Sequence, residues 1–349
     1  MVAAALLTVS LLTTATAAVA SSSSSSASPR SAGLGLRLVD APEARRDDPR
    51  AQIYIVDHIA PGTTISRRVE AINGTAGLLS PALYAGTAEI RNGTFAPSER
   101  GVQGDVAEWT SIEPSRLSLA GGERQTALVT IEVPGDAAPG ERYGVIWAEL
   151  PPVEGGGVAQ VNRVGIRVYL SVGPGGEPAS DFVVESLQVS RSAEGAPVVT
   201  AQVRNTGGRA LDMSGTLELG DGPGGLSAGP FPAELGTTLA PGDTAPVVVE
   251  LDDAIDGGPW NARLVLQSGS LERAAEATIT FPAGAGDEAE PVAAEQIPLD
   301  ATNPWVFAAG ALIGLLSLLL LVFALLKRRS RRNKDEDEDE PELQPAAAV

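Results

Sequence analysis

Residues 118–131, SLAGGERQTALVTI, and residues 238–251, TLAPGDTAPVVVEL, align without a gap. In both segments a turn, Gly-Gly or Pro-Gly, precedes a run in which apolar and polar residues alternate. Such alternation is typical of a β-strand with one face buried and the other solvated. Earlier in each half, residues 69–73 (VEAIN) resemble residues 201–205 (AQVRN). Two repeats in the same order predict two copies of one fold.

The chain between residues 33 and 282 keeps this character throughout. Short β-branched and aromatic runs alternate with Gly and Pro turns, and no window has a sustained helical period of about 3.6 residues. We therefore expect an all-β protein with two tandem Ig-like β-sandwiches, residues 33–173 and 180–282, followed by one C-terminal transmembrane helix. The expected strands are residues 52–56, 65–72, 82–91, 94–95, 117–119, 127–133, 143–150 and 161–172 in the first sandwich, and 182–189, 198–204, 211–219, 245–251, 262–266 and 275–281 in the second.

Two turns define the connections. Asn92-Gly93 suits a type I′ turn, so it predicts a hairpin between residues 82–91 and 94–95. The boundary between the sandwiches falls in GPGGEP, residues 173–178, which does not continue a sheet easily. Asn73-Gly74-Thr75 and Asn92-Gly93-Thr94 also match the glycosylation sequon.

Composition excludes several classes of function. The 349 residues carry a net charge of −19, with no Cys and a single His, His58. An acidic surface repels phosphate backbones, so we expect no nucleic-acid partner. Disulfides, thiolate ligands and multi-His metal sites are excluded, and no nucleophile elbow or P-loop is present. Asp252, Asp253 and Asp256 lack EF-hand spacing and predict a solvated turn. We expect no enzyme, no cofactor and no metal.

The N-terminus predicts export. Residues 1–20 are apolar or small and predict a signal peptide cleaved between Ala20 and Ser21. Residues 21–32 form a Ser-rich linker.

The C-terminus predicts a membrane anchor. Residues 305–326 contain no charge and span about 33 Å as a helix, enough to cross a bilayer. No Leu-Pro-x-Thr-Gly sorting signal precedes them. The expected type I protein has extracellular sandwiches, an acidic Ala/Pro-rich stalk (283–304), and a basic then acidic cytoplasmic tail (327–349). The stop-transfer residues are Lys327, Arg328, Arg329, Arg331 and Arg332.

Aromatic residues are the candidates for glycan contact, because sugar rings stack on exposed aromatic faces. All four tyrosines lie in the first sandwich. Tyr84 and Trp109 flank the long connection 96–107 and are the surface candidates. Trp147 and Trp260 follow the repeated strands, so we expect both in the cores.

The first sandwich resembles a known family. The resemblance lies in residues 35–39 (GLRLV), 48–50 (DPR), 54–62 (YIVDHIAPG) and 139–147 (PGERYGVIW). These segments are similar to the peptidoglycan-binding Ig-like domain of the WxL-interacting protein family of high-GC Gram-positive bacteria such as actinobacteria. The second sandwich, with residues 205–209 (NTGGR), looks more like a generic Ig-like module.

The resemblance implies a non-enzymatic adaptor in the cell membrane that binds peptidoglycan, and a second surface protein, while the helix contacts the lipid bilayer. Two alternatives remain open at this stage. One is a pilus-type assembly chaperone that donates or completes a strand, against which the membrane span counts. The other is a cell-wall hydrolase.

Overall fold

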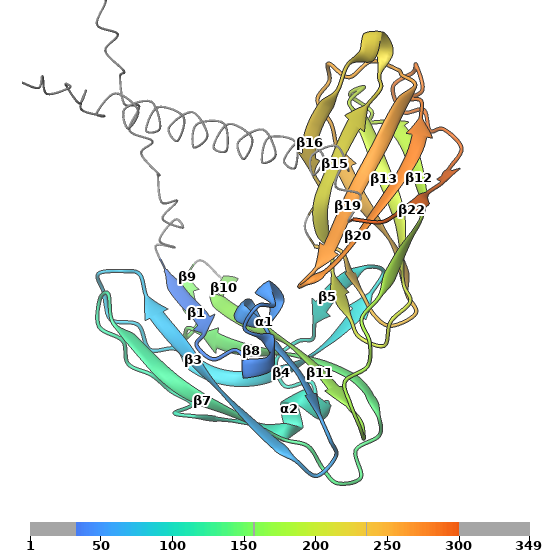
Figure 1. Ribbon diagram of the computed structural model, residues 1–349. Coiled ribbons are helices and arrows are strands. Elements are labelled where there is room, and N and C mark those ends of the chain that lie inside the picture. The colour runs from blue at the N-terminus through green and yellow to red at the C-terminus, as the bar shows by residue number, and fades with distance from the viewer. Residues whose placement is uncertain (1–32, 156–157, 235, 300–349) are drawn as a thin grey trace, which may run out of the picture.

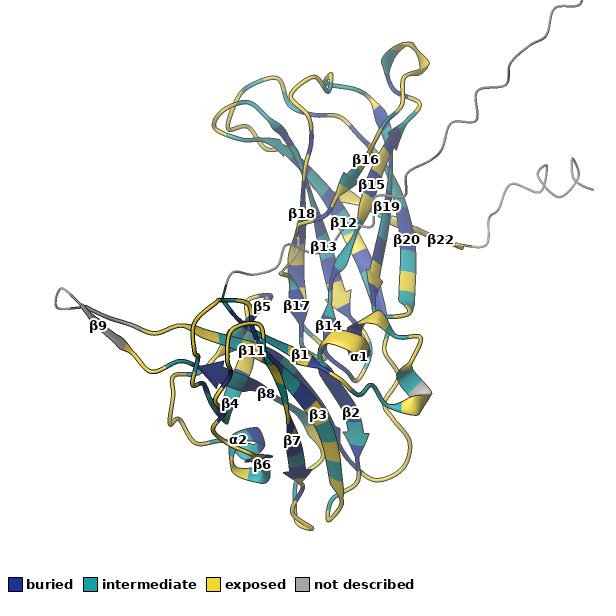
Figure 2. Cartoon of the chain, turned by 90° about the vertical axis from the view of Figure 1, so that its left-hand side faces the viewer, coloured by how far each residue is buried: buried dark blue, intermediate teal, exposed yellow. Residues whose placement is uncertain are grey.

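The computed structural model describes residues 33–155, 158–234 and 236–299. They form two β-sandwiches joined end to side, with their long axes steeply inclined, so the molecule is bent (Figure 1). The prediction of an all-β chain is confirmed, because almost all regular structure is strand. Bands of buried and exposed residues alternate along many strands, as the sequence pattern required (Figure 2).

The first sandwich pairs a four-stranded sheet with a five-stranded one. Their strand orders are β1-β3-β7-β6 and β2-β11-β8-β4-β5. A small hairpin, β9–β10, lies between β8 and β11 in the chain. The bounds are β1 Leu34–Leu38, β2 Ile55–Ile59, β3 Thr64–Asn73, β4 Ala82–Arg91, β5 Thr94–Pro97, β6 Thr110–Glu113, β7 Arg124–Glu132, β8 Gly140–Glu149, β9 Val153–Gly155, β10 Val158–Gln160 and β11 Arg163–Val172.

Short helices interrupt this pattern. They are η1 Glu43–Arg45, α1 Pro49–Ile53 and α2 Asp105–Trp109 in the first sandwich and η2 Pro223–Gly225 in the second. The strand expected at residues 52–56 therefore begins only at Ile55, because α1 occupies its start. Asp48 caps this helix by accepting a hydrogen bond from the Arg50 amide, and Pro49 takes the first helical position.

The second sandwich also has two main sheets, of four and five strands. Their orders are β18-β13-β12-β21 and β16-β15-β19-β20-β22, with the pair β14–β17 beside them. The bounds are β12 Phe182–Arg191, β13 Pro197–Asn205, β14 Leu211–Asp212, β15 Ser214–Gly220, β16 Ala228–Pro232, β17 Thr238–Leu239, β18 Thr244–Glu250, β19 Trp260–Ser268, β20 Leu271–Ile279, β21 Val292–Ala293 and β22 Glu295–Ile297.

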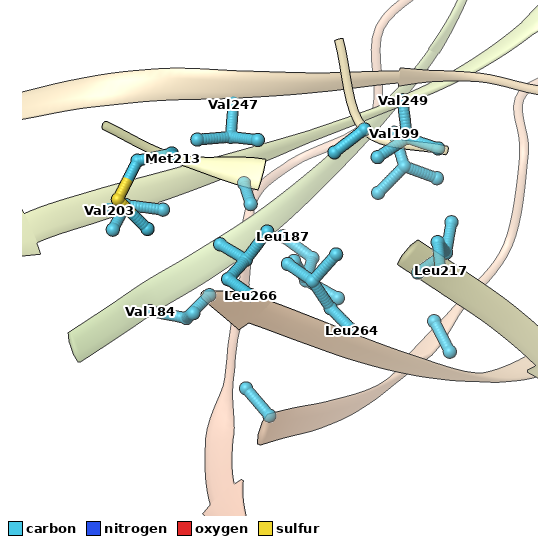
Figure 3. Close-up of a cluster of buried hydrophobic side chains, with 14 of the residues drawn as sticks. Val184, Leu187, Val199, Val203, Met213, Leu217, Val247, Val249, Leu264 and Leu266 are labelled. Carbon is cyan, nitrogen blue, oxygen red and sulfur yellow. The ribbon is translucent and has the colours of Figure 1, made fainter. Parts of the chain in front are cut away.

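Each sandwich has its own core. In the second, side chains from both sheets meet in one apolar cluster that includes Leu187, Leu217, Leu264 and Leu266 (Figure 3). The first has a separate cluster between its sheets. Trp260 is buried in the second core, as expected. Trp147 instead lies half-buried on the outer face of the five-stranded sheet, outside the first core.

The predicted repeats correspond to one shared structural device. The Asn73 side-chain amide donates to the Leu119 carbonyl at 3.0 Å, and that of Asn205 donates to the Leu239 carbonyl at 3.1 Å. In each sandwich the asparagine oxygen also accepts from a backbone amide two residues later. A fully buried amide thus ties the end of β3 or β13 to the turn before β7 or β18.

The segment expected to be an extended stalk contains regular structure. Within residues 283–304, β21 pairs with β12 and β22 pairs with β20, so this part of the chain lies along edges of both sheets of the second sandwich. Backbone groups at a sheet edge are satisfied by such pairing, even when the side chains are exposed.

The described part of the chain contains no helix long and apolar enough to cross a bilayer. The predicted signal cleavage site (Ala20, Ser21), span (305–326) and stop-transfer residues from Lys327 to Arg332 all lie outside the described residues.

Candidate functional site

The outer face of the first sandwich's five-stranded sheet collects the aromatic residues of this sandwich. Tyr169 of β11 lies opposite Tyr143 of β8, and Trp147 of β8 lies opposite Tyr84 of β4. Tyr54, just before β2, places its ring 5.8 Å from that of Tyr169. All four tyrosines therefore lie on one face, which we call the tyrosine face, and the second sandwich stands over part of it (Figure 1).

One carboxylate joins the sandwiches at this face. Asp212 of β14 accepts hydrogen bonds from Arg50 Nε at 2.5 Å, from Arg167 Nη1 at 3.0 Å and from the Tyr169 hydroxyl at 2.6 Å. The Arg50 guanidinium also lies over the Tyr169 ring, 4.0 Å from its centre. Two arginines share this carboxylate, and the buried Glu141 of β8 also interacts electrostatically with Arg50.

The pKa values of this cluster reflect burial beside opposite charges. Burial lowers the pKa of Arg50, but the Asp212 carboxylate and Tyr169 outweigh it and hold that pKa above its usual range. Burial is also the main cause of the raised pKa of Tyr169, with the Asp212 charge second. Arg50 stays cationic and Tyr169 stays a neutral donor.

A second buried ion network lies close by. Arg209 of the second sandwich is 2% exposed and contacts Glu177 of the connecting segment, with Glu141 of β8 at 3.7 Å. Arg45 also contacts Glu177. Burial raises the pKa of Glu141, although the Ala210 amide and nearby Arg50 oppose that rise.

The β4–β5 hairpin makes a third connection. Asn92 and Gly93 both have positive φ, 50° and 74°, which confirms the predicted type I′ turn. The Gly93 carbonyl accepts from the Thr238 amide at 2.7 Å, and a Cβ at Gly93 would lie 2.8 Å from that of Ala245. Three separate contacts therefore fix the angle between the sandwiches.

A pocket of about 380 Å³ lies between these contacts. One wall combines the apolar side chains of α1 and of Tyr54, which follows it, with two cationic groups, Arg50 and Arg167. The far side is formed by residues 212–214 and 236–238. Arg50 Nη2 is buried and has no hydrogen-bond partner among the described residues. An anionic group with an apolar neighbour fits this lining.

The edge of β11 beside this pocket is open. Strand β2 pairs in parallel with β11 only from Val168 to Val172, and β8 covers the other side over the whole length. Among the described residues, no strand pairs with positions 163–167 on the side away from β8. The inner side chain of Val164 is correspondingly half-exposed.

Trp147 lies flat beside this open edge. A Cβ on Gly165 would come within 2.8 Å of its ring, and one on Gly86 within 3.1 Å of Nε1, so only glycines leave room for the indole. The Arg163 guanidinium covers the ring at 4.3 Å from a ring centre.

The predicted glycan-contact residues occupy different settings. Tyr84 is half-buried, donates its hydroxyl to Glu149 at 2.5 Å, and has Arg100 over its ring at 4.5 Å. Trp109 ends α2 and packs against the first core. No described contact joins them. His58 lies in β2 with Nδ1 3.3 Å from the Ser171 hydroxyl, and the described residues hold no group of three acidic or His side chains suited to a metal.

Comparisons with known proteins add solved structures only. No family model matches the chain, and no curated protein matches it. The CupB2 chaperone of Pseudomonas aeruginosa is 10% identical, with 64% of this chain and 97% of that chain covered and a TM-score of 0.36. The CsuC–CsuE chaperone and tip-subunit complex of Acinetobacter baumannii is 14% identical, with 65% of this chain and 96% of that chain covered and a TM-score of 0.35. The periplasmic chaperone SfaE is also 14% identical, with 72% of this chain and 100% of that chain covered and a TM-score of 0.31.

These findings correct several predictions. The WxL-interacting family and its peptidoglycan partner are wrong, because no family model matches and the matching structures include pilus and fimbrial chaperones. The expected actinobacterial source and single-pass membrane localisation find no support in the comparisons either, since neither a family model nor a curated protein matches.

Proposed function

We propose that the chain is a pilus-type assembly chaperone, a non-enzymatic protein that takes up an extended segment of a partner subunit on the open edge of β11. The single observation that carries the proposal is the missing strand beside residues 163–167. An exposed strand edge presents unpaired amides and carbonyls, and an added strand satisfies them by β-augmentation.

The core beside this edge favours the same occupant. Val164 and Ile166 point inward toward the first core, and Val164 stays half-exposed where β2 ends. A partner strand aligned with positions 163–167 would place its own inward side chains beside these two. Burying the exposed part of Val164 and the partner's apolar side chains would stabilise the complex by about 25 cal/mol per Å² of apolar surface removed from water.

The pocket marks where such a segment would end. Strand β2 begins at Ile55 opposite Val168, and the chain turns away into α1 immediately before it. A partner strand collinear with β2 therefore runs toward Tyr54 and the pocket lined by Arg50 and Arg167. A carboxylate at that end would accept a hydrogen bond from Arg50 Nη2, which has no partner among the described residues.

Site-specific photocrosslinking tests the proposal. Benzoylphenylalanine at Val164 of the full chain, expressed in its own cells, should crosslink to an extended segment of one partner protein identified by mass spectrometry. The matched control carries the same group at Leu128, which is 45% exposed on β7 of the opposite sheet. Equal capture from both positions, or none from Val164, would contradict strand addition at β11.

A further inference from the structure

The side chains of the tyrosine face next to the open edge restrict which partner sequences can add a strand there. Outward positions along the open part of β11 are Arg163, Gly165 and Arg167. Inward positions are Val164 and Ile166. A partner strand on this edge would alternate in the same way, with outward residues opposite Arg163 and Gly165 and a third that ends beside Tyr54, the extended residue before β2, within reach of Arg167.

The central position meets an aromatic ring. Gly165 has no side chain, and the Trp147 ring carbons Cε3 and Cζ3 lie where its Cβ would be. An outward partner residue opposite Gly165 therefore reaches the benzo edge of Trp147 across the gap. An aromatic side chain fits best, because edge contacts between aromatic rings add to the burial of apolar area.

The two flanking positions meet positive charge. Arg163 lies opposite Glu149 of β8 but forms no ion pair with it or with any other described residue, and its guanidinium stacks on Trp147. At the other end, Arg50 and Arg167 share one carboxylate, Asp212. Carboxylates two residues to either side of the aromatic residue would complement both ends.

We propose that this surface selects segments with the pattern acidic–apolar–aromatic–apolar–acidic. The two acidic residues would contact Arg163 and Arg167, and the two apolar residues would pack beside Val164 and Ile166. The aromatic residue would lie opposite Gly165 and contact Trp147. This pattern rests on the proposed strand addition and adds the partner's chemistry to it. It is the same in both directions, so it holds for a parallel or an antiparallel partner strand. Salt screens the repulsion between the net charge of −19 and an acidic ligand beyond about 8 Å at physiological ionic strength, so the arginines next to the ligand dominate its electrostatic interaction.

Synthetic heptapeptides test the pattern on the purified full chain. The probe is fluorescein-labelled TEVXVET, in which X is benzoylphenylalanine. Affinity is measured by fluorescence anisotropy, and the crosslinked site is mapped by mass spectrometry. We expect crosslinks to residues 145–149 and 163–167. Arg163→Glu should weaken binding about fivefold, the size of a good partly exposed ion pair.

Charge exchange supplies the decisive comparison. The peptide TKVXVKT should bind the wild type more weakly, and Arg163→Glu should recover part of that loss. The affinities of Arg163→Gln for both peptides should lie between those of the wild type and those of Arg163→Glu. Arg124→Glu, an exposed arginine on the opposite sheet, is the matched control and should change neither affinity.

The outcomes separate the two proposals. Crosslinks on β11 with equal affinities for both peptides would overturn the sequence pattern and leave strand addition standing. Crosslinks by neither peptide to β11 would overturn both. Replacing the aromatic residue by Gly in a competing TEVGVET should raise its inhibitory concentration about tenfold, as loss of an aromatic contact and its burial predicts; unchanged competition would remove the role of Trp147.

Discussion

Asp212 Oδ2 lies 2.5 Å from Arg50 Nε, across the junction between the two sandwiches. These residues are 162 positions apart in the chain, and Arg50 is 8% exposed. Removing one partner of a buried pair leaves the other charge without compensation. That is more costly than replacing both partners by apolar groups.

Asp212→Ala should therefore lower the free energy of unfolding by about 3 kcal/mol. The measurement is urea unfolding of the full chain, followed by fluorescence. Glu89→Ala breaks an exposed pair with Arg91 and is the control, with an expected change below about 1 kcal/mol. Similar losses for both variants would show that the Asp212 cluster does not hold the junction.

The hairpin turn provides a second test of the junction. Gly93 and Gly122 have similar positive φ values, 74° and 78°, but only Gly93 faces another side chain at close range. Gly122→Ala should cost about 1 kcal/mol from backbone strain alone. Gly93→Ala should cost about 1–3 kcal/mol more, because its Cβ would overlap that of Ala245. Equal losses of unfolding free energy for the two variants would mean that the turn does not pack closely against the second sandwich.

The buried asparagines should be equally important in both sandwiches. Asn73→Ala and Asn205→Ala each remove a buried side-chain amide that both donates to backbone carbonyls and accepts from a backbone amide, and each should lower the free energy of unfolding by about 2–4 kcal/mol. Gln125→Ala, on a half-buried side chain in the same turn region whose bond to the Ser118 carbonyl is exposed, should change the free energy of unfolding by less than about 0.5 kcal/mol. A large difference between the two asparagine variants would argue against an equivalent role in the repeat.

The pH dependence of stability should depend on Asp57. Burial raises the pKa of this carboxyl above 3.8 in the folded chain, despite Arg67 beside it. As the pH rises from 3.8 toward the folded-state pKa, the unfolded chain loses this proton first, so the folded state loses stability. The free energy of unfolding of Asp57→Asn, relative to wild type, should therefore rise with pH across this window.

Asp40 gives the control of opposite sign. Its pKa is lowered by a hydrogen bond from Arg68, so its contribution is present above 3.8 and is lost as the pH falls through the folded-state pKa. Relative to wild type, Asp40→Asn should become less stable with rising pH. Urea unfolding between pH 3 and 7 measures both profiles, and parallel slopes for the two variants would contradict this assignment.

Local patterns predicted much of the fold. Alternation identified β7 and β18, and Asn92-Gly93 identified the hairpin turn, because both signals are carried by neighbouring residues. Residues 143–149, YGVIWAE, are apolar on both faces, so alternation alone could not assign the side of Trp147. The short strands β21 and β22 are two and three residues long and have no period to detect.

The candidate site depends on long-range contacts instead. Asp48-Pro49 carries a helix-start signal that would have placed α1 and Arg50 correctly. The pairing of Arg50 and Arg167 with Asp212, however, follows from the angle between the sandwiches, which no local pattern encodes. The open edge of β11 likewise results from where β2 ends, fixed by the turn into α1.

Hydrogen exchange along β11 distinguishes an open strand edge from a covered one. In the free full chain, those amides of residues 163–167 that face away from β8 should exchange rapidly, whereas residues 168–172 are covered by β2 and should be protected. Addition of the TEVXVET peptide should protect residues 163–167 and leave 168–172 unchanged. Protection of 163–167 already in the free chain, or peptide-induced protection only elsewhere, would contradict the account.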